Sequence, residues 1–143
     1  MLASEASYKE DAMQLARKPQ WVTFDCYGTL IDTRIGYAEI WREILAEKGL
    51  DPGPVLTDYI QAWGEEEFRL IQGPYKIYRE ILIESVEATL RAFNHPVGPR
   101  DGRRLAEAWG TFRPYPDVKP ILMALKQHHR LAIISNVDND IIR

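Results

Sequence analysis

A short apolar run that ends in a carboxylate constrains this chain more than any other feature of its sequence. Residues 21–24 are aromatic or β-branched and follow Pro19, which predicts a strand bounded by a breaker. Asp25 comes next, at the carboxyl end of that strand, where open parallel sheets bind their ligands. Gly28 permits a tight turn, and the Thr29 hydroxyl can reach back to the carboxylate. The pattern indicates a nucleophile presented to a crevice; the plainer interpretation is that Asp25 only caps the turn.

A second apolar run lies near the far end of the sequence. Residues 131–134 are all apolar, and Ser135 and Asn136 follow them. A buried strand with a polar turn is common in any α/β protein, so this run says little by itself. Taken with the first run, it brackets a mainly helical stretch. We therefore predict an α/β fold in which helices are inserted between two core strands.

Helical periodicity runs through most of the sequence between the two strands. The predicted helices span residues 37–48, 57–71, 77–93 and 103–110. Gly49 is expected to end the first of them, because glycine commonly follows the last turn of a helix. The sequence Asn94-His95-Pro96 is expected to end the third, because proline disfavours helical geometry in the residue before it. Pro52-Gly53-Pro54 is expected to form a linker between helices.

Two further helices are expected outside this central stretch. Asp117 is a natural N-cap, and apolar residues recur after it at helical spacing, which predicts a helix that leads into the second strand. Its apolar face would hold Val118, Ile121, Leu122 and Leu125. Residues 4–17 are expected to form a short amphipathic helix, for which the sequence indicates no role.

Composition limits the classes of partner. With 143 residues, 45% of them hydrophobic and 27% charged, the sequence is that of a globular domain of ordinary size. The net charge of −3 gives no electrostatic case for nucleic acid, and no apolar run is long enough to span a membrane, so we expect a small-molecule partner. Cys26 is the single cysteine and can form no internal disulfide, which fits a cytoplasmic protein. Strand alternation is expected to point its thiol away from the crevice.

The two strands and their turns carry a resemblance to a known family. The stretch from Phe24 to Asp32 resembles the first motif of the haloacid dehalogenase superfamily, which runs Phe-Asp-x-Tyr-Gly-Thr-Leu-apolar-Asp. The strand that precedes Ser135 looks like the family's second motif. The resemblance implies a Rossmann-like α/β core of parallel strands with an inserted, mainly helical cap, and an incomplete core. The implied boundaries are residues 1–35 and 115–143 for the core and 36–114 for the cap.

Tyr27 decides which branch of the superfamily the sequence resembles. In the superfamily's phosphatases this position is usually a second Asp that protonates a leaving alkoxide, and tyrosine is a poor acid at neutral pH. A departing halide needs no proton, so the sequence is similar to the L-2-haloacid dehalogenase (type II) branch. The resemblance implies a hydrolase that removes halide from a short 2-haloacid through an aspartyl ester on Asp25. It implies no cofactor.

The resemblance also implies roles for particular residues, which would form hydrogen bonds to developing negative charge or line the substrate pocket. The implied catalytic residues are Asp25, Thr29, Ser135 and Asn136. The implied substrate-binding residues are Tyr27, Gln61 and Trp63, and no metal ligands are implied. Aromatic residues at helical spacing, Trp63 among them, are more often part of a core than of a site.

Two departures from the family keep other interpretations open. The family's cap carries an arginine that helps to bind halide, whereas residues 59–63 contain Gln61 and no arginine, so Arg42, Arg69 or Arg79 would have to replace it. The family's lysine and final polar loop, which follow the second motif, have no counterpart in the sequence. One alternative is a Mg²⁺-dependent phosphatase of the same superfamily. Another is a binding or assembly module without catalysis, or a chain that association completes, such as a homodimer.

Overall fold

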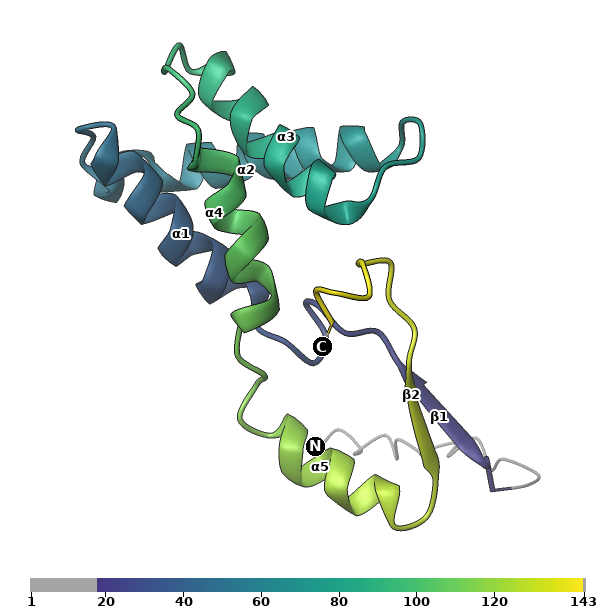
Figure 1. Cartoon of the computed structure of the whole chain (residues 1–143). Helices are drawn as coiled ribbons and strands as arrows, with labels where there is room; N and C mark the ends of the chain where they lie inside the picture. Colours follow the sequence, from purple (N-terminus) through teal and green to yellow (C-terminus); the bar gives the residue numbers. More distant parts are fainter. Residues whose placement is uncertain (1–17, 143) are drawn as a thin grey trace, which may run out of the picture.

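The computed structural model describes residues 18–142, and the helix expected over residues 4–17 lies outside the described residues. Helices α1 to α4 lie together as a bundle, and a two-stranded sheet with α5 lies apart from them (Figure 1). Among the described residues, no helix has both the length and the apolar character that crossing a membrane requires. The elements are β1 (Trp21–Phe24), α1 (Thr33–Glu47), α2 (Pro52–Ile71), α3 (Tyr78–Ala92), α4 (Asp101–Ala108), the 3₁₀ turn η1 (Trp109–Thr111), α5 (Val118–Lys126) and β2 (Arg130–Ile133).

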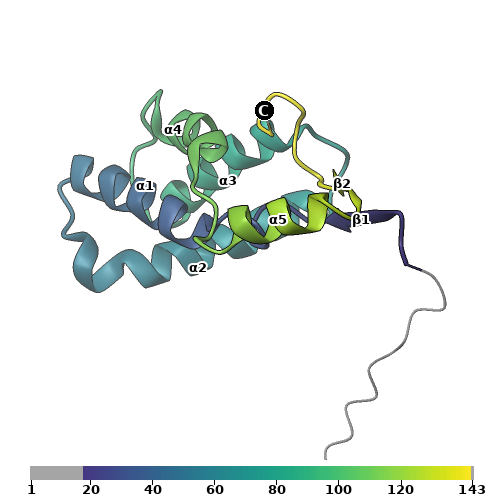
Figure 2. The same ribbon diagram turned by 90° about the horizontal axis from the view of Figure 1, so that it is seen from below.

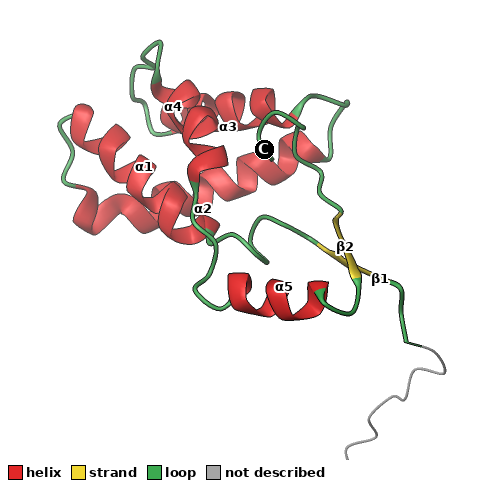
Figure 3. Cartoon of the chain, turned by 60° about the horizontal axis from the view of Figure 1, so that its bottom comes forward, coloured by secondary structure: helices red, strands yellow, loops and turns green. Residues whose placement is uncertain are grey.

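β1 and β2 form a parallel pair and confirm both predicted strands, with β2 one residue earlier than expected. The register runs from Trp21 opposite Arg130 to Phe24 opposite Ile133. One step beyond the sheet, the backbone N–H of Ile134 donates to the carbonyl of Phe24 at 2.8 Å. α5 leads into β2 and lies beside the strands, as Figures 2 and 3 show from two directions. The carboxyl ends of both strands therefore meet at one edge of the sheet.

Apolar side chains hold the four bundle helices together. The fully buried ones include Trp41, Ile44, Leu45, Leu82, Leu90 and Leu105. Removing such side chains from water is the main force that favours folding. α4 also approaches α3 so closely at Gly102 that a Cβ there would lie 2.5 Å from the carbonyl oxygen of Ile83. Glycine is therefore needed at that contact.

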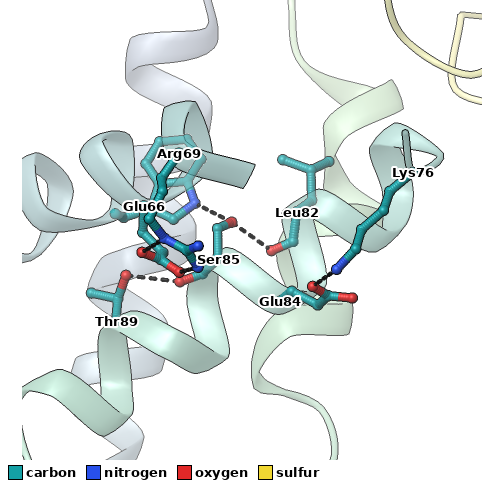
Figure 4. A network of polar contacts seen from close by, with 8 residues as sticks. Glu66, Arg69, Lys76, Leu82, Glu84, Ser85 and Thr89 are labelled. Atoms are coloured by element: carbon teal, nitrogen blue, oxygen red, sulfur yellow. Dashed lines mark hydrogen bonds and ion pairs between the residues drawn. The ribbon is translucent and has the colours of Figure 1, made fainter. Parts of the chain in front are cut away.

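Buried polar groups between α2 and α3 are paired with one another (Figure 4). Trp63 Nε1 donates to Ser85 Oγ at 2.9 Å, and that hydroxyl donates in turn to the carbonyl of Leu82 at 3.1 Å. Thr89 Oγ1 donates to the carbonyl of Ser85 at 2.8 Å. This pairing avoids the cost of leaving buried polar atoms unsatisfied, and it fixes the indole of Trp63.

The first helix starts earlier than the sequence predicts. α1 begins at Thr33 rather than Tyr37, because Asp32 caps it by accepting from the backbone N–H of Arg34 at 3.1 Å. Its end is as predicted, since the chain turns at Gly49 with a φ of +75°.

The linker predicted at Pro52-Gly53-Pro54 is wrong, because these residues form the first turn of α2. Asp51 caps that turn by accepting from the backbone N–H of Gly53 at 3.0 Å. Proline is tolerated in a first turn because the N–H that it lacks has no helical partner there. The prediction failed because it read both prolines as breakers, whereas position within the helix decides their effect.

α5 begins where the sequence predicts, but without the predicted cap. The backbone of Asp117 is helical, at φ −84° and ψ −15°, and its side chain makes no capping hydrogen bond. Side chains cap well from an extended backbone, so the prediction that Asp117 caps this helix is wrong. No residue of α5 is buried, and Ile121 and Met123 are exposed. The predicted apolar face is therefore only partly covered by the described residues, because Val118, Leu122 and Leu125 are half-buried.

Two short segments connect the sheet and α5 to the bundle, and they are hydrogen-bonded to each other. The backbone N–H of Asp32 donates to the carbonyl of Arg113 at 2.9 Å, and that of Tyr115 donates to the carbonyl of Leu30 at 3.1 Å. Ile31 and Pro114 form an isolated antiparallel bridge between them. This pairing fixes how the bundle sits above the carboxyl edge of the sheet.

Candidate active site

Asp25 lies one residue beyond β1, at the carboxyl edge of the sheet. Its side chain is exposed, and the Thr29 hydroxyl donates to its Oδ2 at 2.8 Å. Ser135 lies two residues beyond β2 at the same edge, because the strands run parallel with Phe24 opposite Ile133. The structure thus brings Asp25, Thr29 and Ser135 to one place from two distant parts of the sequence.

A tight turn holds Thr29 against the carboxylate. The carbonyl of Cys26 accepts from the backbone N–H groups of residues 29–31, at 3.3, 2.7 and 3.0 Å. Gly28 closes the turn with a φ of +82°, a conformation that other residues rarely adopt, and its N–H donates to the carbonyl of Ile31 at 2.9 Å. The Gly-Thr pair is therefore the local reason that a hydroxyl faces the carboxylate.

The loop after β2 returns to the bundle and docks on α3. Asp138 accepts from the backbone N–H groups of Tyr78 and Arg79, at 3.0 and 2.8 Å. It thereby caps a helix whose own N-cap residue, Ile77, makes no side-chain cap. The Arg79 guanidinium also donates to Asp140 at 2.8 Å. These contacts tie the loop after β2 to the start of α3.

A cavity of about 340 Å³ lies between this loop, the turn after β1 and the bundle. Its lining includes three residues predicted from the sequence: Tyr27, Trp63 and Asn136. Tyr37, Tyr78 and Trp109 complete a largely aromatic wall. The ring centroids of Tyr37 and Trp63 lie 5.1 Å apart, and those of Tyr78 and Trp109 lie 5.7 Å apart. Such a wall can exclude water and accept an apolar group.

Tyr27 forms part of that wall and is held as a neutral phenol. Its hydroxyl donates to the backbone carbonyl of Ile141 at 3.1 Å. Burial, with a smaller effect of Cys26, raises the pKa of Tyr27. Its ring packs on Trp109 with centroids 5.8 Å apart. Tyr27 therefore shapes the cavity and does not supply a proton at neutral pH.

Sequence reasoning missed Glu67, which lines the same cavity. The Tyr78 hydroxyl donates to its Oε1. Burial raises the pKa of the Glu67 carboxyl, and the bond from Tyr78 lowers it by less. The signal was present in the sequence, because Glu67 follows Trp63 by four residues and so lies on the same face of α2.

Gln61 does not reach the cavity. Its side chain is exposed, and its Nε2 donates to Glu65 Oε1 at 3.1 Å on the outer face of α2. The two residues are four apart, which is the spacing of neighbours on one helix face. Of the three residues predicted to bind substrate, the structure therefore brings Tyr27 and Trp63 together and leaves Gln61 outside.

The arginines that the sequence offered for the family's halide site lie in different places. Arg42 is exposed on α1. Arg69 pairs with Glu66 on α2, with Nε 2.8 Å from the carboxylate (Figure 4). Arg79 instead lines a second cavity of about 400 Å³, together with Ser135 and Asn136. Arg79 is thus the arginine that the structure brings to the loop after β2.

Cys26 is buried and faces away from the aromatic cavity, which confirms its predicted orientation. It lines instead an apolar cavity against α5 and β2. Burial, and to a smaller extent the negative charge of Asp25, raises the pKa of its thiol. The thiol therefore stays protonated and acts as a packing residue rather than a nucleophile.

The carboxylates near the strand ends are engaged by protein donors. Thr29 holds Asp25, and the start of α3 holds Asp138. Within residues 18–142, no three His, Cys, Asp or Glu side chains are grouped so that they would hold a metal ion.

Residues 19–143 match the family model described as haloacid dehalogenase-like hydrolase. A search of curated proteins finds no match. The family match covers both strand ends and the helices between them, which are the parts that build the candidate site.

Solved structures similar to this chain include several L-2-haloacid dehalogenases. The enzyme from Xanthobacter autotrophicus has a TM-score of 0.71 and 22% identity, over 87% of this chain and 49% of that one. A defluorinating L-2-haloacid dehalogenase has a TM-score of 0.73 and 22% identity, over 88% and 54% of the two chains. A third has a TM-score of 0.68 and 27% identity, over 87% and 55%. The chain spans about half the length of these structures, and their likeness confirms its α/β fold.

Proposed function

The chain belongs to the haloacid dehalogenase-like hydrolase family, and from that premise we propose that it hydrolyses the carbon–halogen bond of a short 2-haloacid. One observation carries the proposal: Asp25 stands at the carboxyl edge of the sheet, held by the Thr29 hydroxyl, with a neutral phenol two residues further on. A phenol that keeps its proton suits a leaving group that needs none. The division into an α/β core and a helical cap over residues 36–114 is part of the same proposal.

In the proposed reaction, Asp25 attacks the carbon that bears the halogen. A carbon–oxygen bond forms while the carbon–halogen bond breaks, and the halide leaves with the bonding electron pair. Because the Thr29 hydroxyl holds Oδ2, we assign the attack to Oδ1. Water then adds to the carboxyl carbon of the ester, which regenerates the Asp25 carboxylate and releases a proton and a 2-hydroxy acid of inverted configuration.

The remaining residues at the edge of the sheet are proposed to bind the two ends of the substrate. Ser135 and Asn136 would donate hydrogen bonds to its carboxylate or to the departing halide. Arg79 lines a cavity with both of them, which supports it as the cation that assists halide departure. Tyr27 and Trp63 would cover the rest of the substrate and exclude water.

The test is chloride release from L-2-chloropropionate by the purified chain, without added metal, beside an Asp25→Asn variant. We expect release by the unmodified chain and a loss of roughly a thousand-fold or more in the variant, because the variant lacks the nucleophile. Circular dichroism of both proteins shows whether the variant keeps its fold.

Two other results would contradict the proposal. Mg²⁺-dependent cleavage of a phosphoester without chloride release would establish the phosphatase alternative. A folded chain that releases neither product would indicate a binding or assembly module. Sedimentation of the same sample reports whether activity accompanies a homodimer.

A further inference from the structure

Glu67 is a carboxyl group in the candidate site to which the proposed reaction gives no role. It projects from α2 into the cavity of about 340 Å³ that Tyr27 and Asn136 also line. Among the described residues that line this cavity, none is Lys, Arg or His. The cavity therefore holds an acidic group without a facing protein cation, and such an arrangement favours a cationic ligand over an anionic one.

One phenol does not use the whole hydrogen-bonding capacity of a carboxylate. A carboxylate has two oxygens with about four acceptor positions. Among the described residues, the Tyr78 hydroxyl is the donor to Glu67, and it reaches Oε1. Tyr78 is itself fixed, because its ring packs against Trp109 and its backbone N–H is held by Asp138. Acceptor capacity on Glu67 is therefore left for a ligand.

Four aromatic side chains line the same cavity as this carboxyl group. Tyr37 comes from α1, Trp63 from α2, Tyr78 from α3 and Trp109 from η1, and all four line the cavity. The electron-rich faces of such rings attract cations, and aromatic cages recognise organic ammonium groups in this way. A ligand hydroxyl would donate to the carboxylate, and a ligand methyl group would pack against the rings. An ammonium group is attracted by both the carboxylate and the rings.

We propose that this aromatic cavity is a binding site for an organic ammonium group, with Glu67 as its counter-ion. In the reaction the ammonium group would be the end of the substrate away from the halogen, and that extension rests on the proposed function. Binding of the ammonium group does not rest on the proposed function, because it involves neither Asp25 nor halide release. A substrate with a second carboxylate at that end is disfavoured by Glu67.

The test compares two ligands of nearly the same shape. Choline and its neutral analogue 3,3-dimethylbutan-1-ol are titrated into the full chain, and tryptophan fluorescence is followed, since Trp63 and Trp109 line the cavity. We expect choline to bind at least about ten-fold more tightly than the alcohol. In Glu67→Gln that preference should fall by about ten-fold, whereas Glu65→Gln, which changes an exposed carboxylate on the same helix, should keep it.

A second variant guards against a failure of Glu67→Gln to fold. Tyr37→Leu removes one ring and leaves Glu67 in place, and we expect it to weaken choline binding while binding of the alcohol changes little. Equal binding of both ligands by the unmodified chain would overturn the proposal, as would a choline preference that survives in a folded Glu67→Gln variant. Chloride release is measured separately, so failure of the ammonium site and failure of the dehalogenase proposal are distinguishable.

Discussion

At the scale of single residues, the Thr29 hydroxyl orients the Asp25 carboxylate from an exposed position. The bond depends on the turn that Gly28 permits, because its φ of +82° brings residue 29 back towards the end of β1. A hydrogen bond at a solvated site adds little to stability. Its effect should therefore appear in catalysis rather than in folding.

We expect Thr29→Val to lower kcat for halide release by about ten-fold, because the carboxylate loses the donor that orients it. Thr29→Ser keeps a hydroxyl at the same position and should retain most of the rate. Thermal melting of both variants should match that of the unmodified chain. Equal rates for Thr29→Val and the unmodified chain would show that the bond has no role in orienting the nucleophile.

Glu67 should make stability depend on pH in a direction unusual for a carboxyl group. Burial raises the pKa of Glu67 in the folded state above its ordinary value, so between the unfolded and the folded pKa the folded state binds more protons than the unfolded state. Stability from this group is therefore fully present below the unfolded pKa and is lost as pH rises through the folded pKa. Glu67→Gln should melt at a higher temperature than the unmodified chain at about pH 8, with a difference that shrinks towards about pH 4.

Thermal melts of the two proteins across this pH range test the sign. Glu65→Gln, on the exposed face of the same helix, serves as the control and should show no such trend. A difference between Glu67→Gln and the unmodified chain that grows towards acidic pH would contradict the raised pKa of Glu67.

At the scale of secondary-structure elements, α3 is capped by a residue from outside its own sequence neighbourhood. Asp138 accepts from the first two N–H groups of the helix, and its carboxylate suits the positive end of the helix dipole. The same residue fixes the loop that carries Ser135 and Asn136. One side chain thus links the stability of the bundle to the geometry of the candidate site.

Removing the Asp138 carboxylate should destabilise the fold, whereas removing the Asp117 carboxylate, which makes no capping bond, should not. We expect Asp138→Ala to lower the free energy of unfolding by about 1–2 kcal/mol, because two N–H groups of α3 lose their acceptor. Asp117→Ala at the start of α5 is the matched control and should change it by less than about 0.5 kcal/mol, since Asp117 makes no capping bond. Urea denaturation measures the free energy of unfolding of both variants. Equal losses in the two would mean that the Asp138 carboxylate does not stabilise α3 as a cap.

The sequence predicts the elements better than the contacts between them. Both strands and all five described α-helices occur where apolar periodicity predicts them, because periodicity depends on near neighbours, although α1 and α2 begin four and five residues earlier than predicted. The cap on α3 could not be predicted from the sequence, because Asp138 and Tyr78 are 60 residues apart. Gln61 was placed in the site by analogy of position, yet its helix face points outward. The position of Glu67 in the site could have been predicted, because it follows Trp63 by four residues on the same helix.

At the scale of the whole molecule, the bundle and the sheet differ in how completely they are packed. α1, α3 and α4 contain fully buried side chains, whereas α5 has none that are buried, and β1 and β2 form a sheet of two strands. Ile121, Met123, Ile133 and Ile134 are exposed apolar residues on the α5 and β2 side. Segments with few buried contacts open more often than the rest of a fold.

Hydrogen exchange should therefore divide the chain in two. We expect amides in α3 to exchange slowest and amides in α5 and β2 to exchange at least about ten-fold faster, because the latter elements have few buried neighbours. Exchange measured by mass spectrometry on peptides from each element tests this. Uniform protection across the bundle and the sheet would mean that the exposed apolar face is covered in solution, as a homodimer would cover it.

In the proposed mechanism Asp25 forms an ester with the substrate, and a single turnover in ¹⁸O-labelled water tests this step. With chain in excess over L-2-chloropropionate, water attacks the ester at the carboxyl carbon of Asp25, so the label should enter the peptide that contains Asp25. The first hydroxy acid released should be unlabelled, because its oxygen comes from the aspartate. Label found in the hydroxy acid and absent from that peptide would mean that water attacks the substrate directly, and Asp25 would not be the nucleophile.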